Sequence, residues 1–327
     1  MSALRTHRHI LLEHFNSITA ENCMKPASLH PRENEYAFRT ADQVADFAAR
    51  NKKKLRGHTL VWHNQTPDWF FQNGDEPAGR EQLLARMADH IATVVGHYKS
   101  LAYAWDVVNE AISDDDKGPI LRGSAWHNLA GEDYVAYAFR CAHQADPDCV
   151  LFYNDYNETR PAKAGRIHAF VRDLLEQGMP VSGIGMQGHY SIYAPSGEEI
   201  CAAIELYASL GLQLQITELD VSLFAHEDQT AYPSPPEELL AKQADRYEEI
   251  FSILRKYKRY ITGVTLWGVA DDATWLSNFP YKNRKNWPLL FDDDRRPKEA
   301  SARISELRRQ ACGRTRAPPP PPLRSGC

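Results

Sequence analysis

The sequence predicts an α/β fold, a (β/α)8 or TIM barrel that lacks its first strand. Three observations lead to this prediction. Short apolar runs alternate with longer amphipathic stretches, seven such pairs follow one another, and a helical stretch without a strand before it precedes them. Such alternation is typical of a parallel sheet with helical crossovers, and seven pairs after a lone helix fit an eight-fold barrel without its first strand.

The predicted strands are short and rich in Val, Ile, Leu and aromatic residues, as strands covered on both faces should be. They are Phe15–Thr19, Gly57–Trp62, Tyr103–Val108, Val150–Tyr153, Gly183–Met186, Leu212–Thr217 and Ile261–Trp267. An open doubly wound sheet is the alternative, although no glycine-rich phosphate loop follows any of these runs.

The predicted helices carry apolar residues at three- and four-residue steps, most clearly in Glu81–Tyr98 and in Ala162–Gln177, which Gly178 closes. The lone first helix is Ala3–Glu13, and the others are Asp42–Asn51, Glu132–Ala145, Glu198–Leu210, Pro236–Tyr257 and Lys298–Arg309. The barrel therefore occupies residues 1–309 as one catalytic domain. Residues 310–327 include five consecutive prolines, which predict an extended, disordered tail.

Composition and charge limit which partners the protein can have and where in the cell it is expected. A net charge of −5 gives no reason to expect nucleic acid as a partner, and no run of 18 apolar residues could span a membrane. The N-terminal stretch lacks the features of a secretion signal. The six cysteines show no CxxC or zinc-ligand spacing, as free thiols in a reducing compartment would. We expect a cytoplasmic protein, whose oligomeric state the sequence leaves open.

Polar side chains gather where the predicted strands end, the part of such a barrel that carries active sites. Strand by strand they are Glu21, Asn22 and Lys25; Trp62, His63, Asn64 and Gln65; Asn109 and Glu110; Asn154, Asp155, Tyr156 and Asn157; Gln187 and His189; Glu218 and Asp220; and Trp267 with Asp271 and Asp272. Seven such clusters in succession indicate a lined pocket rather than isolated helix caps.

Glu110 and Glu218 each end an apolar strand, where a carboxylate is costly to bury unless it is paired or functional. Either alone could be a strand-end residue bonded to a neighbouring loop. Together on one rim they are the equipment for glycoside hydrolysis, in which one carboxyl is ionised and the other protonated. We expect repulsion from the anion to raise the pKa of its partner.

Neighbouring residues fit the assignment of one ionised and one protonated carboxyl. Asp220 shares a face with Glu218, and His189 on the adjacent strand is placed to lie between them. Asn109 can donate a hydrogen bond to a sugar 2-hydroxyl, a contact that strengthens in the transition state. Five of the seven tryptophans, Trp62, Trp69, Trp267, Trp275 and Trp287, lie around the expected pocket, where they suit stacking on sugar rings, and we assign this role to Trp267 and Trp275.

Several segments resemble glycoside hydrolase family 10, the retaining xylanases, and more closely its intracellular branch from Gram-positive bacteria. They are NSITAENCMK, RGHTLVWHNQTPDW, WDVVNEA, FYNDYN, GIGMQGHY, ITELDV and LWGVADDATWL, in order over about residues 10–305. The resemblance implies a retaining endo-1,4-β-xylanase without cofactor or metal, with Glu110 as acid/base and Glu218 as nucleophile. Its substrate would be xylan or xylo-oligosaccharides.

The resemblance also implies substrate contacts. They are Glu21, Asn22, Lys25, His58, Trp62 and Gln65 on the non-reducing side, Asn109, Gln187 and His189 around the reacting sugar, and Tyr156 on the leaving-group side. Trp267 and Trp275 would exclude the hydroxymethyl group of glucose. The family begins with a strand of F-x-x-G-x-A type that has no counterpart here, so we expect reduced stability.

Three other functions compete. A β-1,4-glucanase would need room where Trp267 and Trp275 are expected. A metal-dependent barrel hydrolase could use His58, His63, His189, Asp106 and Asp220, but no HxH or HExxH spacing is present. A non-catalytic binding barrel would be expected to have replaced a catalytic glutamate, whereas both are present.

Overall fold

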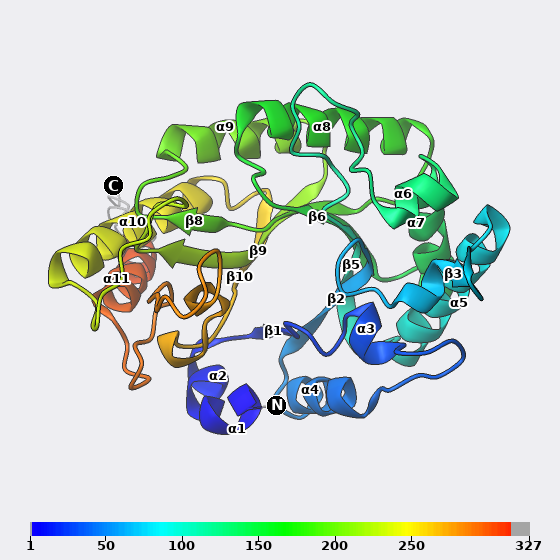
Figure 1. Cartoon of the computed structure of the whole chain (residues 1–327). Coiled ribbons are helices and arrows are strands. Elements are labelled where there is room, and N and C mark those ends of the chain that lie inside the picture. Colours follow the sequence, from blue (N-terminus) through cyan, green and yellow to red (C-terminus); the bar gives the residue numbers. More distant parts are fainter. Residues whose placement is uncertain (1, 315–327) are drawn as a thin grey trace, which may run out of the picture.

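In the computed structural model, which describes residues 2–314, parallel strands form a curled sheet with helices packed on its outside (Figure 1). Seven strands follow one another in the order β1-β2-β5-β6-β7-β9-β10, and an eighth, β8, adds to β9. The strand order follows the chain throughout. In a doubly wound sheet, by contrast, the order reverses at one point. The prediction of a barrel without its first strand is therefore confirmed.

Apart from β8, the strands of this sheet correspond to the predicted apolar runs. They are β1 (Ser17–Thr19), β2 (Lys54–Trp62), β5 (Ala102–Asn109), β6 (Val150–Asp155), β7 (Gly183–Met186), β8 (His189–Ser191), β9 (Gln213–Ser222) and β10 (Ile261–Leu266). A small hairpin, β3 (Gln72–Asn73) with β4 (Glu76–Pro77), and the strand β8 were not expected. All are too short to leave a periodic pattern in the sequence.

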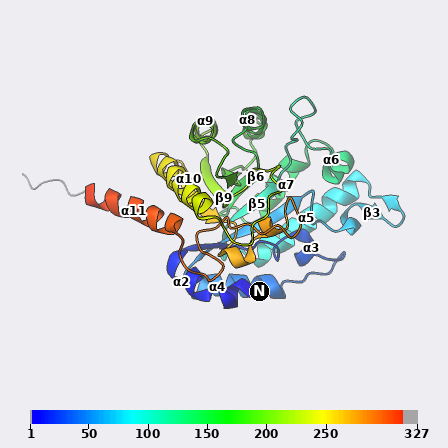
Figure 2. The same ribbon diagram turned by 60° about the vertical axis from the view of Figure 1, so that its left-hand side comes forward.

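The helices cover the outer face of the sheet. They are α1 (Ser2–Thr6), α2 (Arg8–His14), α3 (Pro26–Leu29), α4 (Arg39–Arg50), α5 (Arg80–His97), α6 (Ala125–Ala130), α7 (Tyr134–Ala145), α8 (Pro161–Glu176), α9 (Gly197–Ala208), α10 (Glu237–Lys256) and α11 (Glu299–Arg314), with single 3₁₀ turns η1 (Asp68–Phe70), η2 (Asp271–Ala273) and η3 (Trp275–Ser277). Figure 2 shows α11 continuing away from the body of the barrel beyond α10.

Two predicted helix boundaries were wrong. The first helix is broken at His7, whose buried ring places Nε2 2.7 Å from Asp272 Oδ1. The last helix runs to Arg314 rather than ending at residue 309, because the first proline of the tail comes only at position 318. The rest of the predicted tail, residues 315–327, lies outside the described residues.

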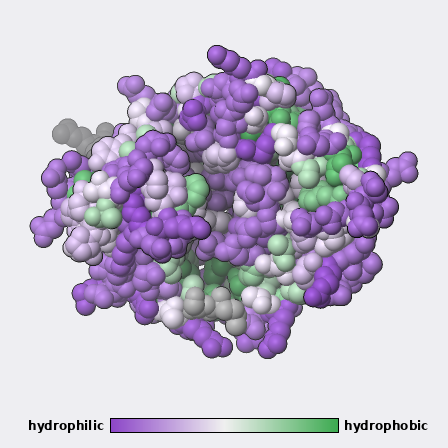
Figure 3. Space-filling model, in the orientation of Figure 1, coloured by the Kyte–Doolittle hydropathy of each residue, from purple (hydrophilic) through white to green (hydrophobic). Residues whose placement is uncertain are grey.

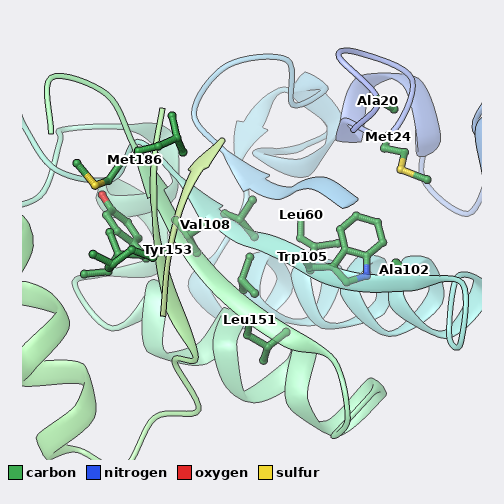
Figure 4. Close-up of a cluster of buried hydrophobic side chains, with 14 of the residues drawn as sticks. Ala20, Met24, Leu60, Ala102, Trp105, Val108, Leu151, Tyr153 and Met186 are labelled. Carbon is green, nitrogen blue, oxygen red and sulfur yellow. The ribbon is translucent and has the colours of Figure 1, made fainter. Parts of the chain in front are cut away.

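The core fills the space between the sheet and the helices, and Figure 4 shows Leu60, Trp105 and Val108 gathered beside the strands. Gly57 on β2 is paired with Trp105 on β5. A Cβ at position 57 would lie 2.1 Å from the Trp105 ring, so only glycine allows this ring to cover the strand. Such burial explains why the strands read as continuous apolar runs.

The sheet has an open seam between β1 and β10. The two strands come within 8 Å of each other between Cα atoms, but the described residues form no ladder between them. Paired strands lie only about 4.8 Å apart. A cavity of 330 Å³ lies at the seam, lined by α1, α2, β1 and the end of β10. Side chains of β10 are partly exposed, whereas those of β5 and β9 are mostly buried.

The surface is mainly hydrophilic (Figure 3), in agreement with the share of charged residues in the sequence, 25%. Figure 3 shows a mainly hydrophilic face with a hollow near its centre. In the described part of the chain, none of the helices has the length and apolarity needed to cross a membrane.

Candidate active site

A cleft of 550 Å³ lies at the carboxyl ends of the strands. Its walls hold all fourteen residues that the sequence assigned to catalysis or substrate contact, namely Glu21, Asn22, Lys25, His58, Trp62, Gln65, Asn109, Glu110, Tyr156, Gln187, His189, Glu218, Trp267 and Trp275. Parallel strands direct their carboxyl ends to one rim, so residues as far apart in the sequence as Glu21 and Trp275 meet there.

Glu218 lies within β9 and is almost fully buried among hydrogen-bond donors. Asn154 Nδ2 donates to its Oε1 at 2.8 Å, and His189 Nε2 lies 3.3 Å from its Oε2. His58 Nδ1 is 3.9 Å from Oε1. Burial raises the pKa of Glu218, but the electrostatic effect of His58 and the charge and hydrogen bond of His189 outweigh it, so the pKa lies below its usual value. This carboxyl is therefore ionised.

His189 is held between two carboxylates, as the sequence suggested. β8 pairs with β9 in a register that sets His189 opposite Asp220, and His189 Nδ1 lies 3.0 Å from Asp220 Oδ2. Burial lowers the pKa of His189, but Asp220 and Glu218 raise it well above its usual value. Trp275 Nε1 donates to the same Asp220 oxygen at 2.8 Å. Asp220 thus orients both an imidazolium and an indole.

Glu110 follows β5 and receives only neutral donors. Trp62 Nε1 donates to its Oε2 at 2.8 Å, and Gln187 Nε2 donates to its Oε1 at 2.9 Å. Burial, then the charges of Asp155 and Glu218, raise the pKa of Glu110 above its usual value. The direction agrees with the sequence prediction, but burial is the largest cause and repulsion from Glu218 the smallest of the three. This carboxyl favours the protonated form.

Side-chain amides connect the two carboxyls. Asn109 Oδ1 accepts from Gln187 Nε2 at 3.2 Å and from Asn154 Nδ2 at 2.8 Å, and these amides also donate to Glu110 and Glu218. Both of these hydrogen bonds use Oδ1 of Asn109. Its Nδ2 group is therefore left to donate into the cleft, whose wall includes Asn109.

One end of the cleft presents a cation and amides. Lys25 Nζ donates to Gln65 Oε1 at 2.8 Å and to Asn22 Oδ1 at 3.1 Å, and it lies 4.8 Å from the centre of the Trp62 ring. Burial lowers the pKa of Lys25, although Glu218, Glu21 and Glu110 oppose the shift. Ordered amides and an ammonium group of this kind suit hydroxyl groups of a sugar.

Below the carboxylates, a buried ion pair fixes His58. Asp106 is 1% exposed, binds the guanidinium group of Arg56 and lies 3.0 Å from His58 Nδ1 through Oδ2. Arg56 in turn donates to Gln215 Oε1 at 2.8 Å. A buried charge left without its partner is strongly destabilising, so this arrangement holds the imidazole in one orientation.

The family model for glycosyl hydrolase family 10 matches residues 1–307. The chain belongs to this family. It is 54% identical to endo-1,4-beta-xylanase B of Paenibacillus barcinonensis over 303 residues, 92% of this chain and 91% of the relative, and 48% identical to an endo-1,4-beta-xylanase of Geobacillus stearothermophilus over 308 residues, 93% and 92% of the two chains.

Solved structures of family 10 agree in fold. Xylanase XynB from P. barcinonensis, complexed with a conduramine derivative, superposes with a TM-score of 0.91 at 53% identity, covering 93% of this chain and 92% of that one. A variant enzyme in complex with xylotriose gives a TM-score of 0.91 at 45% identity, covering 93% of both chains.

Other residues of this family 10 cleft escaped the sequence analysis as substrate contacts. His63, Asn64 and Asn157 lie at predicted strand ends, so their position was the available signal. His226 and Phe279 come from loops, and no sequence pattern pointed to them. Phe279 stacks on Trp275 with ring centres 4.9 Å apart and is 47% exposed. His226 and Phe279 also line a neighbouring cavity of 580 Å³.

The residues named for a metal-dependent hydrolase do not form one cluster. His58 contacts Asp106, whereas His189 contacts Asp220, and His63 lies 4.0 Å from Glu110. Among the residues whose side chains the structure describes, no three His, Cys, Asp or Glu are placed to hold a metal ion. Each imidazole instead has a carboxylate neighbour of its own.

Proposed function

We propose that this chain is a retaining endo-1,4-β-xylanase in which Glu110 is the general acid/base and Glu218 the nucleophile. The observation that carries the proposal is the opposite environment of the two carboxyls on one cleft. Glu218 has imidazole neighbours that lower its pKa, whereas Glu110 is largely buried with neutral donors and has a raised pKa. Family membership and the names of the relatives agree with this activity.

In the first step, the ionised Glu218 carboxylate attacks the anomeric carbon while Glu110 gives its proton to the leaving glycosidic oxygen. The bond to the leaving sugar breaks as the bond to Glu218 forms. The negative charge on Glu218 is then gone, which lowers the pKa of Glu110. Glu110 can now take a proton from water, whose oxygen attacks the same carbon and releases Glu218.

The other cleft residues keep the roles that the sequence suggested. His189, oriented by Asp220, holds Glu218, and Nδ2 of Asn109 donates to the 2-hydroxyl of the reacting sugar. The remaining contacts are Glu21, Asn22, Lys25, His58, Trp62 and Gln65 towards the non-reducing end, Gln187 at the reacting sugar and Tyr156 on the leaving-group side. Asp220 is buried behind His189, and the positions of all the others on the cleft wall support these roles.

Xylose is preferred over glucose because Trp267 and Trp275 occupy the space that a hydroxymethyl group needs. Both rings line the cleft beside His189, with ring centres 6.4 Å and 4.9 Å from its imidazole. Initial rates on xylan and carboxymethylcellulose test this point. Faster cleavage of the cellulose derivative would identify a glucanase instead.

Stereochemistry tests the mechanism. Double displacement requires the two carboxyls to lie about 5–5.5 Å apart and the β-anomer of the product to appear first in NMR spectra. Appearance of the α-anomer first would indicate inversion and would exclude Glu218 as nucleophile.

We also propose that the enzyme belongs to the intracellular branch of the family and cleaves short xylo-oligosaccharides in the cytoplasm. The four cysteines whose side chains the structure describes, Cys23, Cys141, Cys149 and Cys201, are all unpaired, which suits a reducing compartment. Product analysis on xylobiose to xylohexaose and on xylan tests the preference. A much higher kcat/KM on long xylan than on any of these oligosaccharides would contradict it.

A further inference from the structure

Glu110 has an unusual backbone conformation. Its φ of 59° lies in the left-handed region, which residues with a side chain rarely adopt. Its N–H donates to the carbonyl oxygen of Asn154 at 2.9 Å, and its own carbonyl oxygen accepts from Nε of Arg122 at 3.2 Å. A backbone in this conformation persists only where its surroundings hold it.

Arg122 is brought to Glu110 by the loop that joins them. Within this loop Ile112 forms an antiparallel bridge with Leu121, and the N–H of Arg122 donates to Ala111 O at 2.7 Å. The two ends of the loop are therefore tied together. The guanidinium group consequently lies beside the residue that starts the loop.

A second nitrogen atom of Arg122, Nη2, is also engaged. Nη2 donates to Asp114 Oδ2 at 2.9 Å and to the Tyr156 hydroxyl at 2.8 Å. Asp114 further accepts from Lys163 Nζ at 2.8 Å, and this ammonium group lies 3.0 Å from Asp155. Two cations and two carboxylates thus alternate, so that the charges are balanced around Arg122.

From this geometry we infer that Arg122 is a positioning residue for the general acid. Its rigid guanidinium fork, held by Asp114, fixes the carbonyl of Glu110 and thereby the direction of the Glu110 carboxyl towards the leaving oxygen. Lysine cannot replace it, because a single ammonium group cannot make the same fixed set of contacts to Glu110, Asp114 and Tyr156. The inference rests on the proposed role of Glu110 as acid.

The role has a kinetic signature that a loss of folding would not produce. A displaced acid delivers its proton poorly, so the rate depends more steeply on how good the leaving group is. A displacement of about 1 Å in such a site can lower a rate about 10²-fold. Aryl β-xylobiosides, from dinitrophenyl to unsubstituted phenyl, vary the leaving group without adding a sugar on the leaving-group side.

The experiment compares Arg122→Ala, Arg122→Lys and the wild type on this series. Both variants should lose about 10²-fold in kcat/KM on the phenyl glycoside and far less on the dinitrophenyl glycoside. Low concentrations of guanidinium should restore part of the loss in Arg122→Ala. If Arg122→Lys behaves as the wild type, or if both variants lose the two substrates equally, Arg122 does not position the acid.

Arg166→Ala is the matched control. Arg166 on α8 donates to the carbonyl oxygens of Asp116 and Gly118 in the same loop, and Glu110 is not among its hydrogen-bond partners in the described part of the chain. Arg166→Ala should leave unchanged how steeply kcat/KM depends on the leaving group. A dependence as steep as that of Arg122→Ala would show that loop order, rather than the contact to Glu110, is responsible.

Glu110→Ala separates failure of this inference from failure of the proposed function. If Glu110 is the acid, its loss makes the leaving-group dependence steep. A steep dependence in Glu110→Ala with a normal one in Arg122→Ala would overturn only the role of Arg122. A normal dependence in Glu110→Ala would overturn the acid role itself.

Discussion

Replacing His189 by alanine should slow catalysis more than it weakens binding. The change removes a charged neighbour 3.3 Å from Glu218 and 3.0 Å from Asp220. A hydrogen bond to a charged group contributes about 1.5–3 kcal/mol. If the contact to Glu218 is needed in the transition state, its loss lowers kcat about 10- to 200-fold, since about 1.36 kcal/mol corresponds to a factor of ten.

The pH dependence of the same variant has a definite sign. His189 helps to lower the pKa of Glu218 against the opposing effect of burial. Without it the pKa of Glu218 rises, so the nucleophile becomes protonated at a higher pH. The acidic limb of kcat/KM should therefore shift to higher pH, whereas the wild type keeps its activity further into the acid range.

The assay is steady-state hydrolysis of p-nitrophenyl β-xylobioside over a pH series. His168→Ala is a suitable control, because His168 on α8 is bonded to Ser209 and lies outside the cleft. An unchanged kcat with a raised KM would make His189 a simple substrate contact. An unshifted acidic limb would refute its effect on Glu218.

Three further predictions concern the mechanism and the fold. Glu218→Ala should abolish turnover on every substrate, and added azide should restore cleavage with an α-glycosyl azide as product. Glu110→Ala should keep far more activity on dinitrophenyl glycosides than on xylan. If each variant loses the same share of its activity on both substrates, the two roles are contradicted. A chelator such as EDTA should leave activity unchanged, and a loss would support metal-dependent hydrolysis. Adding a strand before residue 1 that pairs with β1 and β10 should raise Tm by about 2–4 °C for each kcal/mol gained. If the 327-residue chain already melts cooperatively at high temperature as a monomer and the longer chain gains nothing, the seam does not limit stability.

Much of the fold could be predicted because each buried strand must be apolar on both faces. The runs found in the sequence became β1, β2, β5, β6, β7, β9 and β10 with small changes at their ends. The break at His7 could not be predicted, since it depends on a contact with Asp272, 265 residues further along. The strand β8 is only three residues long and exists because β9 offers it an edge.

The cleft residues were predictable for a related reason. Most lie at or just after the carboxyl end of a strand that the apolar pattern marks, and parallel strands end at one rim. Asp106 shows the limit of this reasoning. Its position within a strand allowed it to be read as a metal ligand, but it is neutralised by Arg56 on the neighbouring strand and orients His58. Which charges meet across a sheet depends on register, and register is not visible in the runs themselves.

The assignment of two different roles to two glutamates also depends on neighbours. Sequence reasoning made repulsion between them the source of the difference, but Glu218 is only a minor cause of the raised pKa of Glu110. Glu218 has His58 and His189 beside it, whereas the donors to Glu110 are the neutral Trp62 and Gln187. Burial acts on both carboxyls in the same direction, so the two imidazoles beside Glu218 decide which one ionises first. A change that removes those imidazoles should therefore bring the two pKa values together more effectively than a change that moves the carboxyls apart.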